Sequence, residues 1–364
     1  MEGSPVRVSF PHMGNSHIAI KCLLENLGAE VIVPPKINRR TLELGTRYSP
    51  EGACLPFKIN LGNFLESIEL GTDALLMLGG FGACRFGYYG EIQKKILEDM
   101  GYRLEFVIMD PQLWPELWKG LQRISNKFSF LQFCAAFYLA WEKMQKVDTL
   151  ERFLLTKRAY PETRGEVEEL YRMGIQSIEL SSNLKELKIH WQELKRRIEK
   201  VSWGRKTEPL KIGIIGEFYM VMEPAANLNI EKILGDRDVE VIRSFYLSDW
   251  IKHNVVLRRM LDKRIKKVAS PYLAYGICGH GQENIAETIL YARAGIDGII
   301  HLAPFGCMPE IVAKSILPSI SRDTDTPLLY LSLDEHAGEA GIVTRIEAFL
   351  DLLKRKRENK AISY

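Results

Sequence analysis

The feature that most constrains the fold is an alternation of short apolar runs with helical segments, present at both ends of the chain. Near the N-terminus, runs typical of β-strands cover residues 6–10, 29–35, 74–78 and 102–110. Apolar residues at helical spacing fill the intervals at 17–27, 55–70 and 90–100. Strands that alternate with helices imply a parallel sheet with helices on both faces. The sequence therefore predicts a doubly wound α/β domain over residues 1–110.

The middle of the chain, residues 111–207, lacks this alternation. It is rich in Leu, Lys, Arg, Glu and Trp, and its apolar spacing of three and four residues is typical of helices. We expect helices near 115–145, 148–158, 163–175 and 181–202. Only helices are expected in this segment.

The alternation returns in the last part of the chain. Strands are expected at 210–218, 238–245, 271–279, 297–304 and 326–334. Helices are expected at 227–234, 282–294, 308–317 and 340–357. The predicted fold is α/β, with doubly wound parallel-sheet domains at 1–110 and 208–364 and the helical segment 111–207 between them.

The composition argues against several classes of protein. The 364 residues are 46% hydrophobic and 26% charged, with a net charge of +3. This near-neutral balance gives no support for binding to nucleic acid or to an acidic membrane surface. The sequence shows neither an uninterrupted apolar run of about 18 residues nor a secretory pattern at its start. We expect a cytoplasmic protein with no nucleic-acid and no membrane partner, whose six cysteines are not paired in disulfides.

Three cysteines lie in Gly- or Pro-containing turns of similar character. They are Cys54 in EGACLPFKINLG, Cys84 in GGFGACRFGYYGE and Cys307 in APFGCMPE. Glycine lets backbone N–H groups approach sulfur closely, and a helix N-terminus stabilises a thiolate. Together the three favour ligands of an iron–sulfur cluster, because zinc would more typically show a close C-x-x-C pair. Taken singly, each is equally well explained as a small buried residue.

The remaining cysteines and the glycine-rich loop leave alternatives open. Cys278, in YGICGHGQEN, is either a fourth ligand or a residue that lines the cleft. The loop after residue 78 lacks the third glycine of a dinucleotide-binding motif. Instead, three of its glycines are expected to bring the backbone close to the cofactor: Gly79, Gly80 and Gly82. Cys22 and Cys134 lie on predicted helices and are expected in the core.

Several titratable residues follow predicted strands or precede predicted helices. His280 and Glu283 are candidate proton donors beside a redox centre, or else they belong to a helix N-terminus. His12 either faces the cleft or belongs to a capping turn. The same choice between a role in the cleft and a structural role applies to two further groups: Glu217, Tyr219 and Glu223, and Asp334, Glu335, His336, Glu339 and Arg345.

Taken as a set, five stretches resemble the 2-hydroxyacyl-CoA dehydratase superfamily, which also includes benzoyl-CoA reductase subunits. They are YSPEGACLPFKINLGNF, MLGGFGACRFGYYGE, IGEFYMVMEPAAN, GHGQENIAETILYARAGIDGIIHLAPFGCMPEI and LSLDEHAGEAGIVTRIEAFLD. The resemblance is to an uncharacterised, activase-related branch; it covers nearly the whole chain and is weak in the helical middle. It implies two flavodoxin-like domains with a [4Fe-4S] cluster between them, held by Cys54, Cys84 and Cys307.

The resemblance also implies partners. An ATP-dependent activator of the sugar-kinase/actin-like class would deliver a low-potential electron, and a small-molecule substrate would bind at the open iron. One related protein is a homodimer with a double-cubane cluster, so the resemblance is compatible with a homo-oligomer. A double cubane needs more thiolates than three, which favours the single cluster here. The true dehydratases have two dissimilar subunits and a CoA pocket, for which this sequence gives no obvious support.

Three hypotheses follow from the sequence. The first is an iron–sulfur dehydratase or reductase of a small substrate. The second is a non-catalytic iron–sulfur scaffold, or a cluster-carrying partner of the activator. The third is a metal-free α/β binding protein whose cysteines only pack.

Overall fold

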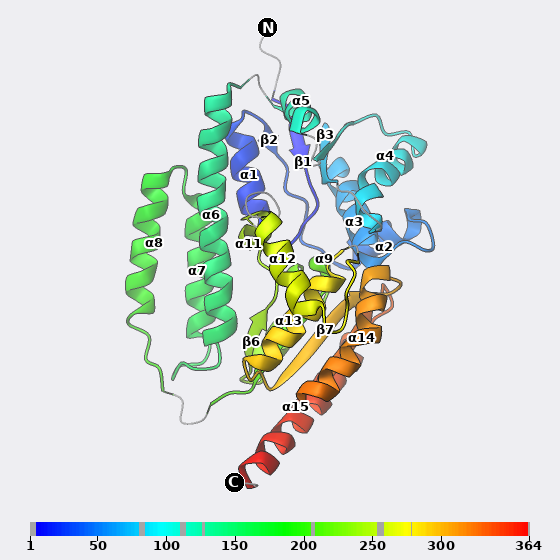
Figure 1. Cartoon of the computed structure of the whole chain (residues 1–364). Helices are drawn as coiled ribbons and strands as arrows, with labels where there is room; N and C mark the ends of the chain where they lie inside the picture. Colours follow the sequence, from blue (N-terminus) through cyan, green and yellow to red (C-terminus); the bar gives the residue numbers. More distant parts are fainter. Residues whose placement is uncertain are drawn as a thin grey trace. The chain divides into compact units, whose positions relative to one another are not determined.

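The computed structural model describes residues 5–79, 84–109, 114–125, 128–204, 208–252, 258–277 and 279–362. For residues 114, 258–262 and 361–362 it describes the backbone alone. Contacts between residues divide the chain into two compact units, Met1–Met144 and Gln145–Tyr364. The division falls inside the long helix α6 (Phe130–Lys157), so the helices of residues 111–207 are shared between the units (Figure 1).

The first unit contains a four-stranded, all-parallel sheet with the strand order β2-β1-β3-β4. Its strands are β1 (Arg7–Ser9), β2 (Glu30–Val31), β3 (Ala74–Leu78) and β4 (Glu105–Met109). The helices of this unit besides α6 are α1 (Ser16–Asn26), α2 (Arg39–Tyr48), α3 (Leu55–Glu69), η1 (Arg85–Tyr88), α4 (Tyr89–Asp99) and α5 (Trp114–Ile124). The predicted α/β character is confirmed, although the sequence did not predict α2.

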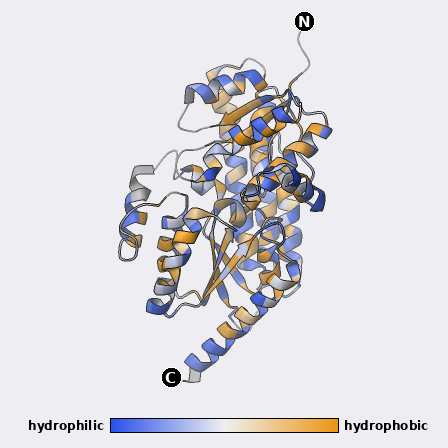
Figure 2. Ribbon diagram, turned by 90° about the vertical axis from the view of Figure 1, so that its right-hand side faces the viewer, coloured by the Kyte–Doolittle hydropathy of each residue, from blue (hydrophilic) through white to orange (hydrophobic). Residues whose placement is uncertain are grey.

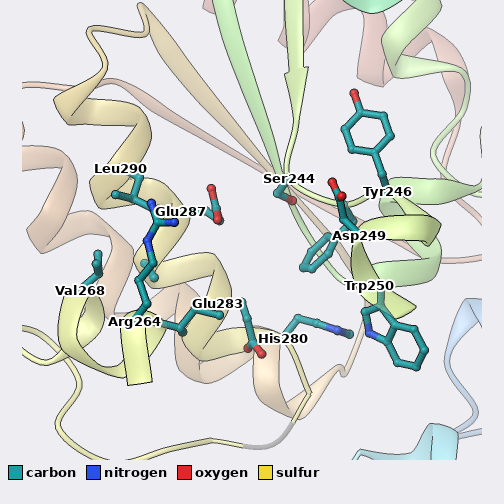
Figure 3. A pocket seen from close by; sticks show the side chains of 13 residues that line it. Ser244, Tyr246, Asp249, Trp250, Arg264, Val268, His280, Glu283, Glu287 and Leu290 are labelled. Carbon is teal, nitrogen blue, oxygen red and sulfur yellow. The ribbon is translucent and has the colours of Figure 1, made fainter. Parts of the chain in front are cut away.

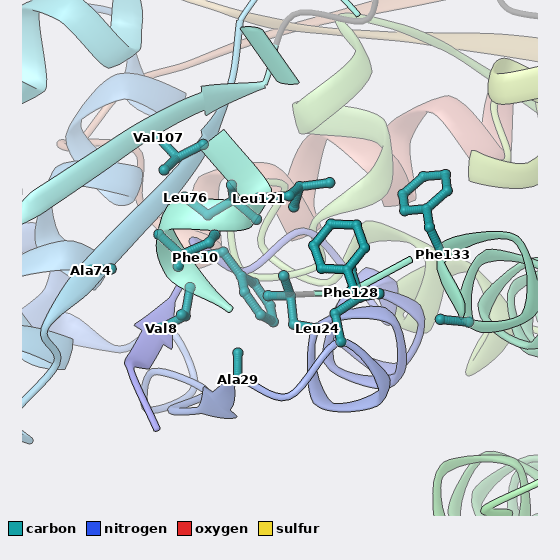
Figure 4. Packing of buried hydrophobic residues seen from close by; sticks show 13 residues of the cluster. Val8, Phe10, Leu24, Ala29, Ala74, Leu76, Val107, Leu121, Phe128 and Phe133 are labelled. Atoms are coloured by element: carbon teal, nitrogen blue, oxygen red, sulfur yellow. The ribbon is translucent and has the colours of Figure 1, made fainter. Parts of the chain in front are cut away.

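Strand β3 shows why this sheet is buried on both faces. Ala74 and Leu76 join one hydrophobic cluster, which also contains Val8 of β1 and Val107 of β4 (Figure 4). Leu75 and Met77 point to the other face and pack in a second cluster. Successive side chains of a strand point to opposite faces, so a continuous apolar run fits a strand covered by helices on both sides.

Helices α2 and α3 cross at a contact that two glycines make possible. A Cβ atom added to Gly45 would lie 1.7 Å from the backbone oxygen of Lys58. A Cβ atom added to Gly62 would lie 2.0 Å from the backbone oxygen of Thr41. The two backbones therefore touch, and every residue of α3 from Leu55 to Ser67 is buried.

The second unit repeats the strand order of the first. Its sheet is all parallel, with the order β6-β5-β7-β8. The strands are β5 (Lys211–Gly216), β6 (Glu240–Arg243), β7 (Gly298–Pro304) and β8 (Leu328–Leu333). The helices after α6 are α7 (Glu166–Leu180), α8 (Leu184–Ile198), α9 (Phe218–Met222), α10 (Ile230–Gly235), α11 (Leu247–Ile251), α12 (Arg258–Ala269), α13 (Gly281–Arg293), α14 (Met308–Thr324) and α15 (Glu339–Ile362).

Two sequence predictions for these elements are wrong. Residues 271–277 form turns and irregular backbone instead of a strand. Tyr272 and Leu273 pack against the hydrophobic core of the unit from this loop, which explains why the stretch is apolar although it is not a strand. In addition, α6 is continuous through residues 146–147, where the sequence predicted a break.

Hydrophobic residues are concentrated in the strands, and the last turns of α15 are hydrophilic (Figure 2). None of the helices within the described ranges combines the length and the apolar character needed to cross a membrane.

Candidate functional site

The shared strand order places a topological switch point in each unit. In the first unit, β1 and β3 are neighbours, and the chain leaves them toward opposite edges of the sheet. In the second unit, β5 and β7 hold the same places. Open parallel sheets bind ligands beyond the carboxyl ends of such strands. Cys84 follows β3 and Cys307 follows β7, so each of these cysteines lies at the expected crevice of its own sheet.

In the first unit, the segments that carry Cys54 and Cys84 lie side by side. Cys54 immediately precedes α3, and its sulfur lies in hydrogen-bond contact with the hydroxyl of Tyr89. Arg85, the residue after Cys84, donates from Nη1 to the backbone oxygen of Gly52 at 2.6 Å. The Tyr89 ring packs edge-on against Phe57 of α3 at 5.0 Å between centroids. Side-chain contacts therefore join these two loops.

In the second unit, Cys307 immediately precedes α14. Its backbone oxygen accepts from the N–H of Ile311 at 2.9 Å, which begins the helix, and Pro309 occupies the first turn. The loop before α13 lies against this point. A Cβ atom added to Gly279 would lie 2.8 Å from Cγ of Pro309, and one added to Gly281 would lie 2.7 Å from the backbone oxygen of Pro309. Glycine thus allows residues 279–281 to approach the start of α14.

The cysteine ligand set can be compared with these positions. Cys54, Cys84 and Cys307 are all partly exposed and all immediately precede a helical turn. Cys54 also packs against a hydrophobic cluster of the first unit. Within the described residues, no group of three His, Cys, Asp or Glu side chains lies in position to hold a metal ion. Cys54 and Cys84 belong to the first unit and Cys307 to the second. Their convergence stays a prediction.

The other predicted cofactor contacts are only partly described. Cys278, Gly80 and Gly82 lie outside the described residues. The N–H of Gly79 donates to the backbone oxygen of Met109 at 2.8 Å and so continues the pairing of β3 with β4.

The two cysteines predicted for the core differ from each other. Cys22 is buried in α1, as predicted. Cys134 is exposed on α6, so that prediction is wrong. Its neighbour Phe133 faces the core, and the helical rotation of 100° per residue turns Cys134 away from it.

The sequence did not predict a buried polar network at the carboxyl end of β7. Glu310, in the first turn of α14, is 2% exposed, and its Oε2 lies 2.7 Å from Nε2 of His301 in β7. The same oxygen accepts from Nδ2 of Asn284 in α13 at 2.8 Å. Asn284 also exchanges two hydrogen bonds of 3.0 Å with the backbone of Gly216 at the end of β5. The network joins both strands of the switch point to α13 and α14; a histidine inside the apolar strand IIHLAP was its only sequence signal.

Glu217 lies beside this network and carries a perturbed carboxyl group. It immediately precedes α9, and its Oε2 accepts from the N–H of Met220 at 3.0 Å. Burial raises the pKa of Glu217 to about 7, and the nearby Glu310 adds to the rise. The carboxyl can therefore hold or release a proton near neutral pH. Tyr219, grouped with it in the sequence, is buried within α9.

His280 and Glu283, the two predicted proton donors, both line a cavity of about 180 Å³ in the second unit (Figure 3). His280 is half-buried, stacked on Phe218 at 5.5 Å and edge-on to Phe245 at 4.7 Å between centroids. Burial lowers the pKa of His280 to about 4, although Glu310 opposes this shift. A lowered pKa favours the uncharged imidazole at neutral pH, which could accept or donate a hydrogen bond.

Three of the remaining sequence candidates make contacts within their own units. His12 is buried, and its Nε2 lies 2.6 Å from the backbone oxygen of Pro34. His336 is in an exposed turn, where its backbone N–H donates to Oδ1 of Asp334 at 2.9 Å. Arg345 donates to the backbone oxygen of Tyr330 at 3.0 Å.

Comparison with known proteins assigns no family to the chain. It matches no protein-family model, and no curated protein matches it.

Proposed function

We propose that this protein is an iron–sulfur redox protein that reduces or dehydrates a small substrate. Cys54, Cys84 and Cys307 would hold a [4Fe-4S] cluster, with Cys278 as a candidate fourth ligand. An ATP-dependent activator of the sugar-kinase/actin-like class would supply the electrons. The resemblance to the 2-hydroxyacyl-CoA dehydratase superfamily suggests this reaction class.

The observation that carries the proposal is the position of the three cysteines. Cys84 and Cys307 follow the switch-point strands β3 and β7. Cys54 and Cys307 immediately precede the long helices α3 and α14, and all three cysteines are partly exposed. Backbone N–H groups at the start of α3 and α14 favour negative charge, which suits thiolates and an anionic cluster. When bound, a cluster of this kind supplies one-electron transfer at low potential.

The residues of the second unit suit the handling of protons near such a centre. With a pKa of about 7, Glu217 can keep a proton on its carboxyl at neutral pH and release it to a basic group. The neutral imidazole of His280 can accept or donate a hydrogen bond. The aromatic rings of Phe218 and Phe245 pack against it.

The test is anaerobic reconstitution of the full chain with iron and sulfide. We expect about four irons and four sulfides per chain. Cys307→Ala and Cys54→Ala should lose the iron while the circular dichroism spectrum stays unchanged. Cys134→Ala is the matched control and should keep the full iron content, because this thiol is exposed on α6.

Two outcomes would change the proposal. If the wild-type protein binds no iron under these conditions, or if Cys307→Ala keeps the full complement, the ligand assignment fails. If the cluster forms but the EPR spectrum of the reduced protein ignores every small molecule offered, the protein is a cluster-carrying scaffold instead of an enzyme.

A further inference from the structure

The cavity of the second unit has walls from three stretches of the chain, residues 244–250, 264–268 and 280–290. Ser244 and Phe245 follow β6, and Trp250 belongs to α11. Arg264 belongs to α12, and the remaining wall comes from the start and middle of α13. Figure 3 shows these side chains around a common space. The cavity of about 180 Å³ is smaller than the roughly 300–1,000 Å³ of drug-sized sites, so it suits a small molecule.

One part of the wall is aromatic. Phe245, Tyr246, Trp250 and His280 all line the cavity. The Tyr246 ring already carries the guanidinium groups of Arg152 and Arg243, so it is not counted as a site for a ligand cation. Aliphatic groups complete this apolar surface, among them Leu290 of α13. Aromatic faces attract cations because their π-electrons give the ring face a negative potential. A ligand with an apolar body and a positive charge would match both properties.

The charged groups of the wall are mainly acidic. Three carboxylates, from Asp249, Glu283 and Glu287, line the cavity together with one guanidinium, from Arg264. Arg152 forms an ion pair with Asp249 from outside the lining. Among the described side chains, the lining therefore holds more carboxylates than guanidinium groups, and the ion pair with Arg152 accounts for Asp249. Burial raises the pKa of Glu287 although Arg264 opposes the shift, so this carboxylate would gain from a further positive charge.

A separate observation comes from Ser244. Its Oγ is buried and has no hydrogen-bond partner among the described residues, yet Ser244 lines the cavity. A buried hydroxyl without a partner costs free energy, which a ligand with a hydrogen-bonding group would recover. The described lining therefore offers an apolar wall, several carboxylates and a polar atom that needs a partner.

From these features we infer that the cavity binds a small organic ammonium ion, a primary or secondary amine with a short aromatic or branched aliphatic body. The amine N–H groups would face Glu287 and the Oγ of Ser244, and the apolar body would lie on Trp250 and Phe245. The role of this ligand as the substrate of the iron–sulfur reaction rests on the proposed function, but its binding does not.

The test is calorimetric titration of the metal-free full chain with two matched probe sets. One set is 2-phenylethylamine, 2-phenylethanol and phenylacetate; the other is isoamylamine, isoamyl alcohol and isovalerate. Within each set the shape is nearly constant and only the charge changes. We expect at least one amine to bind at least tenfold more tightly than its alcohol, and neither acid to bind. If no amine binds, or if an acid binds as tightly as its amine, the inference is wrong.

Variants tie the binding to the cavity. Glu287→Gln and Trp250→Leu should each weaken amine binding at least fivefold, with unchanged thermal unfolding as evidence of an intact fold. Glu193→Gln, at an exposed position on α8, should leave binding unchanged. Equal binding by wild type, Glu287→Gln and Trp250→Leu would exclude this cavity. Cys307→Ala should keep amine binding while it loses iron, so failure of the ammonium site and failure of the cluster proposal are distinguishable.

Discussion

The sulfur of Cys54 contacts the hydroxyl of Tyr89, 35 positions later in the chain. This contact joins the start of α3 to the start of α4. Cys54, one proposed ligand, is thus held by a residue close in sequence to Cys84, another proposed ligand. Tyr89 is buried between Phe57 and Phe86, so its hydroxyl has a fixed position.

A double-mutant cycle measures this contact. Tyr89→Phe and Cys54→Ala should each lower the free energy of unfolding of the metal-free protein, and the two effects should be coupled by roughly 0.5–1.5 kcal/mol. Urea unfolding followed by circular dichroism gives the four values. Tyr138→Phe, at an exposed position on α6, is the control for loss of a hydroxyl. Strictly additive effects would mean that the contact contributes nothing to stability.

The contact between α2 and α3 predicts that alanine destabilises the protein at Gly62 but is tolerated at Gly52. Gly62→Ala should lower the free energy of unfolding by about 3 kcal/mol, since the new methyl group would meet the backbone oxygen of Thr41 and neither helix can move without opening the core. Gly52→Ala has open space and should change stability by less than about 0.5 kcal/mol. Similar urea midpoints for the two variants would contradict this account.

The raised pKa of Glu217 predicts a pH-dependent stability. Its folded pKa of about 7 exceeds the ordinary value of 4.5, so the folded state holds more protons in this interval. The free energy of unfolding therefore falls as pH rises from 4.5 to 7, by up to roughly 3 kcal/mol. Glu217→Gln keeps an oxygen for the N–H of Met220 and removes the titration. Between pH 5 and 8, the free energy of unfolding of Glu217→Gln, measured with urea, should rise relative to that of the wild type. If the difference between the two proteins does not change with pH, Glu217 is not the group that titrates.

The pKa of His280 shifts in the opposite direction to that of Glu217, so its effect on stability has the opposite dependence on pH. Its folded pKa of about 4 lies below the ordinary 6.5, so its contribution to stability is lost as pH falls from 6.5 to 4. Both proteins in the Glu217 experiment carry His280, so its effect cancels in their difference.

A buried ion cluster predicts a large stability loss. Arg243 of β6 is 3% exposed and pairs with Glu151 of α6 and Glu231 of α10. Arg243→Met would leave the buried carboxylate of Glu151 and the partly buried one of Glu231 without this cation, and should cost roughly 3–5 kcal/mol. Arg39→Met breaks an exposed pair with Glu43 and should cost less than about 1 kcal/mol. Thermal unfolding of both variants checks the contrast, and equal midpoints would show that burial adds nothing.

The sequence by itself determined the local elements and their class. Apolar runs such as ALLML form strands wherever both faces of a sheet are covered, and the alternation with helices selects parallel pairing. Glycine and proline next to Cys54 and Cys307 located these cysteines just before helices for the same local reason. The pattern failed at residues 271–277, because periodicity cannot distinguish an apolar strand from an apolar loop that covers a core.

Tertiary structure alone decided which side chains meet. Glu310, His301 and Asn284 come from three elements. Nothing in their local sequence determines that His301 and Asn284 both contact the same carboxylate oxygen of Glu310. The same is true of Ser244, Trp250 and Glu287 around the cavity. Hydrogen bonds and cavities depend on distances between elements, which the packing of helices on the sheet sets; the periodicity of a sequence records only which face of each element is buried.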